Sequence, residues 1–587
     1  MLRTFDTHRI RRTTELGGLW DFTVLPDDTQ TESTSKPAPE TAPVAPPRKV
    51  TVPSCWQTYP GLENYRGQAR YSTTFEAEGN IRLEFKGVSH FAHVELDGEV
   101  LGEHYNAYTP FVFAVPALGP GEHRLDVTVD NAFRDNYALN FPNDYMSYGG
   151  ISRPVEVGFI PDTSIERIHV TPIAPGSGSG SGSGANSDAD APWRAHVEIW
   201  CRTLRKPRAG IRLTLGVELA GRRIEADVTP GSGEYLALAT TIDCPGARPW
   251  TCEDPALYPV TATLLANGRP IDDLIDRVGF RTVRVNGERI ELNGRPITIR
   301  GFCRHEDHPA FGNALPPQAM QVDLDLIEDM HGNAVRTSHY PNDERFLDMC
   351  DERGILVWEE NHARGMDEEH MRNPHFQAQA AQVIREMIET HYNHPSIVIW
   401  GILNECASNT AYGRECYERQ YALIRELDAS RPATSATCHM RDDRCLDLPD
   451  VVSWNIYPYW YEAKSATRMI DEQLAYTRAH GGEGKPLIIS EIGAGAIYGF
   501  RNRDEEIWTE EYQAITLRKQ LTEAFANPAV TGVFIWQFCD VRVDREWWRV
   551  RAKRRNDKGI VDEFRRPKLA YDAVREVFGE VAARTER

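Results

Sequence analysis

Strand-like and helix-like segments alternate through the C-terminal half of the chain, and this alternation constrains the fold more than any other feature. Over residues 281–587, apolar runs such as AVRTSHY (334–340), IVIWGILNE (397–405) and PLIISEIG (486–493) alternate with amphipathic runs such as VDLDLIEDMH (322–331). Repeated strand-then-helix units over this length favour a closed (β/α)8 barrel. The active site of such a barrel lies at the carboxyl ends of its strands, so polar residues there are the first candidates for chemistry.

Two regions of short alternating strands precede the barrel. Residues 1–162 contain runs such as IRLEFKGV (81–88) and HRLDVTVDN (123–131), separated by Gly, Pro and Asp turns. Runs of this kind without a long helix predict a β-sandwich. Residues 163–280 contain a second series, including AGIRLTLGVELAG (209–221), at the spacing of a small immunoglobulin-like β-sandwich. We therefore expect two β domains followed by a C-terminal barrel.

Two low-complexity stretches are expected to be exposed loops. Residues 26–49 are rich in Pro, Thr and Ser, and residues 174–192 are a Gly/Ser tract followed by Asp and Ala residues. Neither composition buries enough apolar surface to fold, so we assign no chemistry to these stretches.

The charge of the chain limits its partners. A formal net charge of −20 argues against a nucleic-acid or anionic-membrane surface, because binding phosphates requires concentrated positive potential. The N-terminal sequence MLRTFDTHRIRRTTELGGLWDF lacks the apolar run of a secretory signal, and no run of about 18 apolar residues follows it. We expect a cytoplasmic protein that binds neither nucleic acid nor membrane, and any anionic ligand must meet a local basic pocket.

The eleven cysteines show no CxxC pair or other metal-like spacing. An odd count in a chain without an export signal fits free thiols in a reducing compartment. A single disulfide, such as one between Cys244 and Cys252, is an alternative that the sequence leaves open.

Two glutamates at strand ends are candidates for glycosidic bond cleavage. Retaining cleavage needs an acid that protonates the leaving oxygen and a carboxylate that attacks the anomeric carbon, about 5 to 5.5 Å apart. Glu405 ends IVIWGILNE and Glu491 ends PLIISE, but a strand-end acid is more often an ordinary charge, as Glu359 and Glu360 in ILVWEE illustrate. Asn404 distinguishes the pair, because an amide beside the acid is suited to bind the sugar 2-hydroxyl.

A series of motifs resembles glycoside hydrolase family 2, and within it the bacterial β-glucuronidases. The motifs extend over nearly the whole chain: GGLWDF (17–22), NDYMSYGGISRPV (143–155), GFCRHEDHPAFG (301–312), NAVRTSHYPNDERFLDMCDERGILVWEE (333–360), NHPSIVIWGILNE (393–405), SEIG (490–493) and RNDKGIVDEFRRPK (555–568). The resemblance implies a jelly-roll sugar-binding-like domain, an immunoglobulin-like domain and a catalytic barrel. These correspond to the three regions predicted from the strand patterns.

The resemblance also implies roles for individual residues. Glu405 matches the acid/base and Glu491 the nucleophile, so we expect a raised pKa for Glu405 and the lower pKa for Glu491. Tyr457 is placed to donate a hydrogen bond to the nucleophile. Asp144 matches an acid that reaches from the first domain to bind a sugar hydroxyl. The positions that match the lining of the sugar pocket are His305, His339, Tyr340, Asn404, Tyr457, Tyr461 and Trp536.

A short motif points to a uronic acid as the substrate. Asn556, Asp557 and Lys558 form an N-x-K arrangement that matches the carboxylate-recognition motif of β-glucuronidases. A buried substrate carboxylate must be paired, and an ammonium and an amide can do this. We therefore expect hydrolysis of terminal β-D-glucuronides, including oligosaccharide ends, through a covalent glycosyl-enzyme. The basic segment 542–558 is either a solvated face or a local field for anionic substrates, and the placement of Arg551 stays open.

Other functions differ in which residues they require. A β-galacturonidase would use the same N-x-K contact and differs only in the orientation of the C4 hydroxyl of its sugar. A neutral-sugar enzyme such as a β-galactosidase leaves Lys558 without a function, and a non-catalytic carbohydrate-binding protein needs neither Glu405 nor Glu491.

A metal enzyme would draw its ligands from four histidines that show no recognised spacing: His305, His308, His339 and His362. We expect no metal and no cofactor. Because relatives in the family often form dimers or tetramers, we expect a homo-oligomer.

Overall fold

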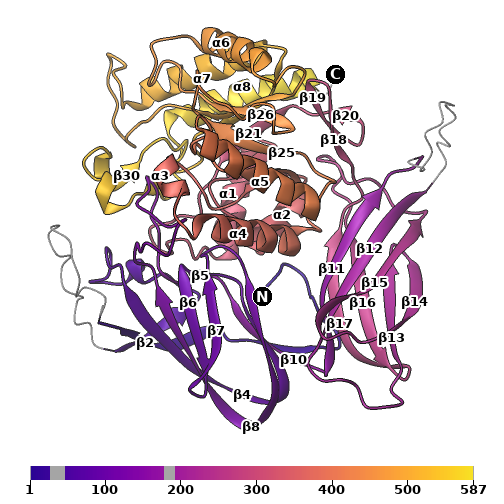
Figure 1. Ribbon diagram of the computed structural model, residues 1–587. Helices are drawn as coiled ribbons and strands as arrows, with labels where there is room; N and C mark the ends of the chain where they lie inside the picture. The colour runs from indigo at the N-terminus through magenta and orange to yellow at the C-terminus, as the bar shows by residue number, and fades with distance from the viewer. Residues whose placement is uncertain (1, 27–46, 177–191, 586–587) are drawn as a thin grey trace.

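A computed structural model describes residues 2–26, 47–176 and 192–585. The chain forms two β domains and a barrel, with the barrel above the two β domains in the view of Figure 1. Most of the two predicted low-complexity loops, residues 27–46 and 177–191, lies outside the described residues.

The N-terminal domain is built on one antiparallel sheet of eight strands, in the order β1-β10-β4-β8-β6-β7, with β2 paired to β4 and β3 paired to β2. Apolar residues alternate along its strands and pack together, as Tyr71, Leu83 and Val127 illustrate. The short strands β5 (Val88–Ser89) and β9 (Gly150–Ile151) pair separately. The sheet strands are β1 (Arg12–Glu15), β2 (Gly18–Val24), β3 (Arg48–Val52), β4 (Gln68–Phe85), β6 (Phe91–Leu96), β7 (Glu99–Tyr105), β8 (Phe111–Asp130) and β10 (Val155–Ile160).

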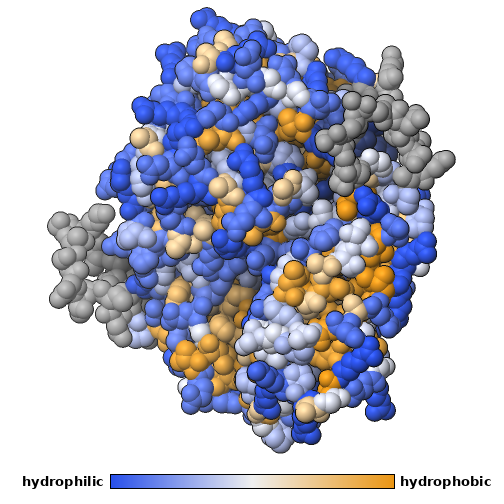
Figure 2. All heavy atoms as spheres, turned by 45° about the vertical axis from the view of Figure 1, so that its right-hand side comes forward, coloured by the Kyte–Doolittle hydropathy of each residue, from blue (hydrophilic) through white to orange (hydrophobic). Residues whose placement is uncertain are grey.

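The second domain is a sandwich of a three-stranded and a four-stranded sheet, which encloses its own hydrophobic core. The first sheet contains β11 (Thr163–Ile173), β12 (Trp193–Thr203) and β15 (Gly233–Cys244). The second contains β13 (Leu213–Leu219), β14 (Arg222–Val228), β16 (Tyr258–Ala266) and β17 (Arg269–Val278). Figure 2 shows a mostly hydrophilic surface with larger apolar areas over the lower, β-domain part of the molecule.

The third domain is a closed barrel of eight parallel strands in sequence order. Every residue of β22 to β28 is buried, because one strand face meets the barrel interior and the other meets the helices. A small sheet of β18 (Val283–Asn286), β19 (Arg289–Leu292) and β20 (Arg295–Pro296) packs on the interior residues of the barrel. The barrel strands are β21 (Ile299–Cys303), β22 (Ala334–Thr337), β23 (Leu356–Glu360), β24 (Ile397–Ile402), β25 (Ala433–Thr437), β26 (Val451–Asn455), β27 (Leu487–Ile492) and β28 (Val530–Ile535).

The helices follow the strands as predicted, except that the described connection between β25 and β26 contains no helix. Local signals set their ends: Asp343 accepts a hydrogen bond from Arg345 N at the start of α2, and Gly354 ends α2 with φ 73°. The helices are α1 (Pro317–Asp329), α2 (Glu344–Arg353), α3 (Glu368–Met371), α4 (Phe376–His391), α5 (Ala411–Leu427), α6 (Ala466–Ala479), α7 (Glu510–Ala526) and α8 (Leu569–Thr585).

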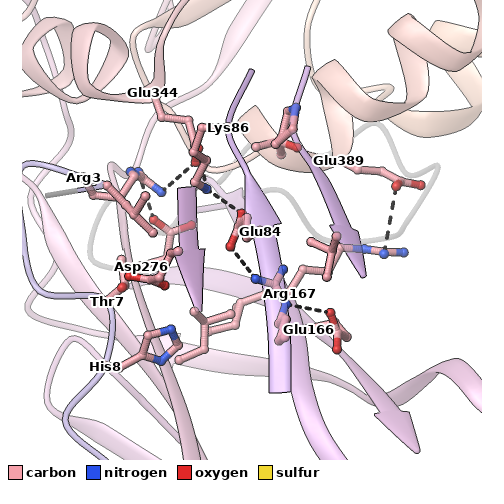
Figure 3. A pocket seen from close by; sticks show the side chains of 18 of the residues that line it. Arg3, Thr7, His8, Glu84, Lys86, Glu166, Arg167, Asp276, Glu344 and Glu389 are labelled. Atoms are coloured by element: carbon pink, nitrogen blue, oxygen red, sulfur yellow. Dashed lines mark hydrogen bonds and ion pairs between the residues drawn. The ribbon is translucent and has the colours of Figure 1, made fainter. Parts of the chain in front are cut away.

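A polar cavity of about 430 Å³ lies where all three domains meet (Figure 3). Lys86 Nζ from the first domain ion-pairs with Glu84 at 2.6 Å and with Glu344 of the barrel at 2.7 Å. Arg3 ion-pairs with Asp348 of the barrel at 2.7 Å and with Asp276 of the second domain at 3.3 Å. These contacts fix the first domain against the barrel.

The first domain also reaches the barrel mouth. Asp544, which follows the barrel strands, accepts hydrogen bonds from Asn143 N at 3.0 Å and Ser147 N at 3.1 Å, and it ion-pairs with Arg66. Asp144 therefore stands on a segment that is held at the mouth.

All eleven cysteines lie in the described part of the chain and are free, so Cys244 and Cys252 form no disulfide. Among residues 2–26, 47–176 and 192–585, the structure contains no helix long and apolar enough to cross a membrane.

Candidate active site

Glu405 and Glu491 both lie at the carboxyl end of the barrel. Glu405 follows β24, and Glu491 is the second-last residue of β27. Asn455, the last residue of β26, pairs with Glu491 in the strand register, and its Nδ2 donates a hydrogen bond of 2.9 Å to Glu405 Oε1. One residue therefore links the two acids at a single mouth, as chemistry with paired carboxylates requires.

Glu491 is held by two donors. Arg336 Nη1 donates to its Oε1 at 3.0 Å, and the Tyr457 hydroxyl donates to its Oε2 at 2.6 Å. The predicted hydrogen bond from Tyr457 is confirmed. Because the side chain of Glu491 is only 5 % exposed, these two bonds fix the direction of the carboxylate.

The protonation of Glu491 differs from the prediction. Burial, reinforced by the neighbouring Glu405 carboxylate, raises the pKa of Glu491 to about 7, although Arg336 and Tyr457 oppose the shift. The expectation that Glu491 is the acid with the lower pKa did not anticipate this upward shift. The physical reason is that desolvation disfavours the charged form of a buried carboxyl.

Glu405 occupies a more open position. Its side chain is 23 % exposed, compared with 5 % for Glu491. Glu405 and Leu403 adopt φ angles of 51° and 46°, in the left-handed region that residues with a side chain rarely occupy. Backbone conformations of this kind concentrate at functional sites. An acid on the open side of the pocket is suited to exchange protons with a leaving group and with water.

Asn404 offers a free donor. Its Oδ1 accepts hydrogen bonds from Arg336 Nη2 at 2.8 Å and Asn455 Nδ2 at 3.1 Å. Its buried Nδ2 has no partner among the described residues. A buried amide donor without a partner is costly, so this atom is placed to bind a ligand oxygen, as predicted for the sugar 2-hydroxyl.

Two histidines and a tryptophan form one wall. His339 stacks on Trp536 with ring centres 5.1 Å apart, and His305 meets the same tryptophan edge-on at 5.5 Å. Burial lowers the pKa of both histidines well below the usual range, so both are neutral. The Nε2 atoms of both rings have no partner in the described chain, which leaves them available to a ligand.

The two predicted tyrosines outside this wall take different positions. The Tyr340 hydroxyl lies 3.2 Å from His305 Nδ1 and accepts from Glu306 N at 3.0 Å, while the ring stacks on Tyr108 of the first domain. Tyr340 therefore supports His305 from behind. Tyr461 is 62 % exposed and lies at the rim.

Lys558 is a buried ammonium without a carboxylate partner. It is 2 % exposed, and no ion pair to an acid is formed within the described part of the chain. Its Nζ lies 5.2 Å from the ring centre of Tyr461 and 5.8 Å from that of Tyr457. Burial, with a contribution from Arg551, lowers its pKa. The arrangement leaves a positive charge at the pocket that an anionic group can neutralise.

Asp144 links the first domain to this end of the pocket. It ion-pairs with Arg364 at 2.9 Å and Arg551 at 2.8 Å, and Asn556 Nδ2 donates to it at 3.1 Å. Although burial opposes the shift, Arg364 and Arg551 hold the pKa of Asp144 well below its usual range. The buried Oδ1 of Asn556 has no described partner. The structure thus brings Asp144 and Asn556 together and resolves the position of Arg551.

Sequence reasoning missed four residues of the site. Arg336 is fully buried and binds Glu360 through two nitrogens, at 2.9 and 3.0 Å, as well as Glu491 and Asn404. Glu360, set aside as an ordinary charge, also contacts His339 Nδ1 at 2.7 Å. Arg336 is the one charged residue inside the apolar run AVRTSHY, and this was the sequence signal that could have identified it. The other residues missed are Asn455 and Arg364.

The histidines considered as metal ligands do not come together as a ligand group. Among the described residues, one group of three side chains could hold a metal: Asp348, Asp351 and His394. Asp348 of this group is already paired with Arg3.

Three family models cover the chain. Residues 283–583 match the TIM barrel domain of glycosyl hydrolases family 2, residues 63–152 match the galactose-binding domain-like model of family 2, and residues 186–281 match a further family 2 model. The chain belongs to glycosyl hydrolases family 2. The predicted fold class and family are confirmed, and the protein is a glycoside hydrolase.

Individual relatives of this family 2 enzyme are similar to it over almost its whole length. It is 49 % identical to a β-galacturonidase from Eisenbergiella tayi bound to galacturonate, with a TM-score of 0.89 and 99 % of each chain covered. It is 25 % identical to the β-glucuronidase of Bifidobacterium dentium complexed with coumarin-3-O-glucuronide, with a TM-score of 0.83 and 98 % of each chain covered. It is 26 % identical to the β-glucuronidase of Paenibacillus borealis, again over 98 % of each chain.

Proposed function

We propose that this family 2 enzyme is a retaining exo-β-uronidase with β-D-galacturonides as its preferred substrates. The observation that carries the uronate preference is Lys558, a buried ammonium with no carboxylate partner in the described chain. Its neighbour Arg551 adds a second cation, and Asn556 Nδ2 donates to the same Asp144 that pairs with Arg551. Lys558 and Arg551 both act on the single carboxylate of Asp144, so a neutral sugar would leave buried positive charge without a full counter-charge, which is costly.

The two glutamates divide the reaction into two steps. Glu491 attacks the anomeric carbon while Glu405 donates its proton to the glycosidic oxygen, which leaves with the aglycone as an alcohol. Glu405 then removes a proton from water, and the water oxygen displaces Glu491 from the anomeric carbon. Two inversions give net retention. Asn404 Nδ2 is placed to bind the 2-hydroxyl, a contact that strengthens in the transition state.

The free enzyme must lose a proton before the first step. Since the pKa of Glu491 is raised to about 7, the carboxyl is partly protonated at neutral pH. The hydrogen bonds from Arg336 and Tyr457 favour the ionised form that attacks the sugar.

A wall beside Lys558 supports action on chain ends. Asp144, Arg364 and Arg551 join the first domain to the barrel at this end of the pocket. A further sugar on that side would have to displace these buried ion pairs. The enzyme is therefore proposed to release single terminal residues.

The choice of sugar rests on similarity. Sequence reasoning favoured glucuronides, but identity of 49 % to a β-galacturonidase, against 25–26 % to β-glucuronidases, supports galacturonide as the first choice. β-D-Glucuronide is the second candidate, because the same N-x-K contact serves both epimers and two of the relatives compared are β-glucuronidases.

Matched substrates test this proposal. We would measure kcat/KM of the wild type and Lys558→Ala on p-nitrophenyl β-D-galacturonide, β-D-glucuronide and β-D-galactoside. The wild type should prefer a uronide, and Lys558→Ala should lose about 100-fold on it, the scale of removing one partner of a buried charge pair, with little change on the galactoside. A wild type that prefers the galactoside, or an unchanged uronide rate in Lys558→Ala, would contradict the proposal.

Two further properties concern the location of the protein in the cell and its assembly. Eleven free cysteines support a location in a reducing compartment such as the cytoplasm. Assembly into a homo-oligomer stays a prediction.

A further inference from the structure

The turn that carries Asn556 and Lys558 is held by buried polar side chains from other segments. Gln537 Nε2 donates to Asn556 O at 3.1 Å, and Gln513 Nε2 donates to Gly559 O at 3.0 Å. Both glutamines lie in the barrel domain and are at most 1 % exposed. The backbone of the turn is therefore bonded at each end.

Lys568 and Asp540 complete this set of contacts. Lys568 Nζ donates to Asp540 Oδ1 at 2.7 Å and to Asp557 O at 3.3 Å, and Asp540 Oδ1 accepts from Gly559 N at 2.9 Å. The side chains of Lys568 and Asp540 are 0 % and 1 % exposed. The pair thus contacts the turn on both sides of Lys558, through the backbone of the residue before it and the residue after it.

A third contact ties the turn to the neighbouring loop. Lys568 Nζ also donates to Ala496 O at 2.7 Å, and Ala496 N donates to Asp557 O at 2.8 Å. Gly559 packs so closely that a Cβ there would lie 2.2 Å from Asp540 N. The turn therefore has little room to move relative to the end of the barrel.

Lysine alone does not fix the direction of an ammonium group, because its four-carbon side chain is flexible. Buried apolar residues would fill the space of Lys568 and Asp540 with a smaller desolvation cost. The specific contribution of the pair is therefore geometric: it fixes the backbone from which Lys558 extends.

We propose that Lys568 and Asp540 are positioning residues that hold the Asn556–Gly559 turn so that Lys558 meets the substrate carboxylate. This inference rests on the proposed uronidase function. Neither residue touches the sugar, and both act through the turn. Loss of this support displaces Lys558, and displacements near 1 Å are enough to weaken a positioned contact by about 100-fold.

Selectivity distinguishes positioning from general stability. The measurement is the ratio of kcat/KM on the preferred uronide to kcat/KM on β-D-galactoside, together with KM and the melting temperature. In Lys568→Met we expect the ratio to fall by about tenfold or more, mainly through a higher KM for the uronide. The galactoside rate should change little.

Lys86→Met is the matched control. Lys86 is another lysine held by carboxylates, Glu84 and Glu344, at the three-domain cavity (Figure 3), and its side chain is 12 % exposed. Its removal should lower the melting temperature and leave the selectivity ratio unchanged. Asp540→Asn, which keeps an oxygen for Gly559 N–H, carries the test if Lys568→Met does not fold, and it should lower the ratio by a smaller factor.

The outcomes separate the two proposals. If the wild type prefers the uronide but the ratio is unchanged in Lys568→Met or, where that variant does not fold, in Asp540→Asn, the positioning role is wrong and the uronidase function stands. An equal fall of the ratio in Lys86→Met would also overturn it, because the effect would then follow stability alone. If the wild type shows no uronide preference, the proposed function itself fails.

Discussion

The proposed reaction end of the site is built on barrel strands, whereas the proposed carboxylate-binding end is built mainly on loops and on the first domain. The reaction end consists of Glu405, Glu491, Arg336, Asn404 and Tyr457, which lie on or directly after β22, β24, β26 and β27. The carboxylate end consists of Asp144, Arg364, Arg551, Asn556 and Lys558, which are held by contacts between distant segments.

This difference separates two tasks of the enzyme. Strand ends in a closed barrel are rigid, so they suit groups whose mutual distance decides the mechanism. Loops and domain contacts tolerate substitution, so they suit groups that choose the substrate. Substitutions at the reaction end should therefore affect every glycoside, and substitution of Lys558 at the carboxylate end should affect uronides selectively.

The largest effect is expected at Glu491, the proposed nucleophile. Glu491→Gln should lower kcat/KM by about 10⁴-fold or more on uronide and galactoside alike, because no carboxylate remains to attack the anomeric carbon. Steady-state kinetics and circular dichroism would check the loss against an intact fold. A loss of kcat/KM on uronides alone would contradict the assignment of Glu491 to the reaction end.

Substitution of Glu405, the proposed acid/base, should cause a large loss of activity that depends on the leaving group. Glu405→Ala should lower kcat by about 10³-fold for a poor leaving group such as an alkyl glycoside, and less for p-nitrophenol, which needs little protonation. Added azide should restore turnover and give the β-glycosyl azide, because azide needs no general base. Equal losses for both leaving groups would argue against the assigned role.

Asp144 tests the contact between domains. Asp144→Asn removes the counter-charge of Arg364 and Arg551, and it should lower kcat/KM by about 30-fold on the uronide. Since Asp144 is also expected to bind a sugar hydroxyl, the galactoside rate should fall as well, unlike in Lys558→Ala. Activity unchanged on both substrates would remove Asp144 from the site.

The smallest effect is a shift in pH dependence. Glu491 must be ionised to attack, so kcat/KM of the wild type should fall as pH drops below about 7. Tyr457→Phe removes a hydrogen bond that lowers the pKa of Glu491, so this acid limb should move to higher pH, by up to about one unit. A shift to lower pH would contradict the assigned effect of Tyr457.

The reaction end could largely be predicted from sequence because most of its residues lie at or just after the end of an apolar strand. Glu405 and Glu491 carried this signal, and Asn455 at the end of β26 carries it too. The pKa of Glu491 could not be predicted, because it depends on how deeply the folded pocket buries the carboxyl. Arg336 stands inside a strand rather than after it, which obscured its role.

The carboxylate end was predictable only where a motif existed. Asn556 and Lys558 were found through N-x-K, but Arg364 and Arg551 meet Asp144 across more than 200 residues of sequence, and no local pattern encodes such a contact. The missing helix between β25 and β26 was not anticipated either, because the regular barrel pattern was extended over a connection that has none.

Trapping of the covalent intermediate tests the central claim most directly. The enzyme would be incubated with 2-deoxy-2-fluoro-β-D-galacturonyl fluoride, whose glycosyl-enzyme forms and then hydrolyses slowly, and the label would be located by peptide mass spectrometry. A single added fluorouronosyl group on Glu491, absent in Glu491→Gln, is the predicted result. A label on another residue, or no label while the corresponding neutral fluorosugar is trapped, would contradict a retaining uronidase with Glu491 as its nucleophile.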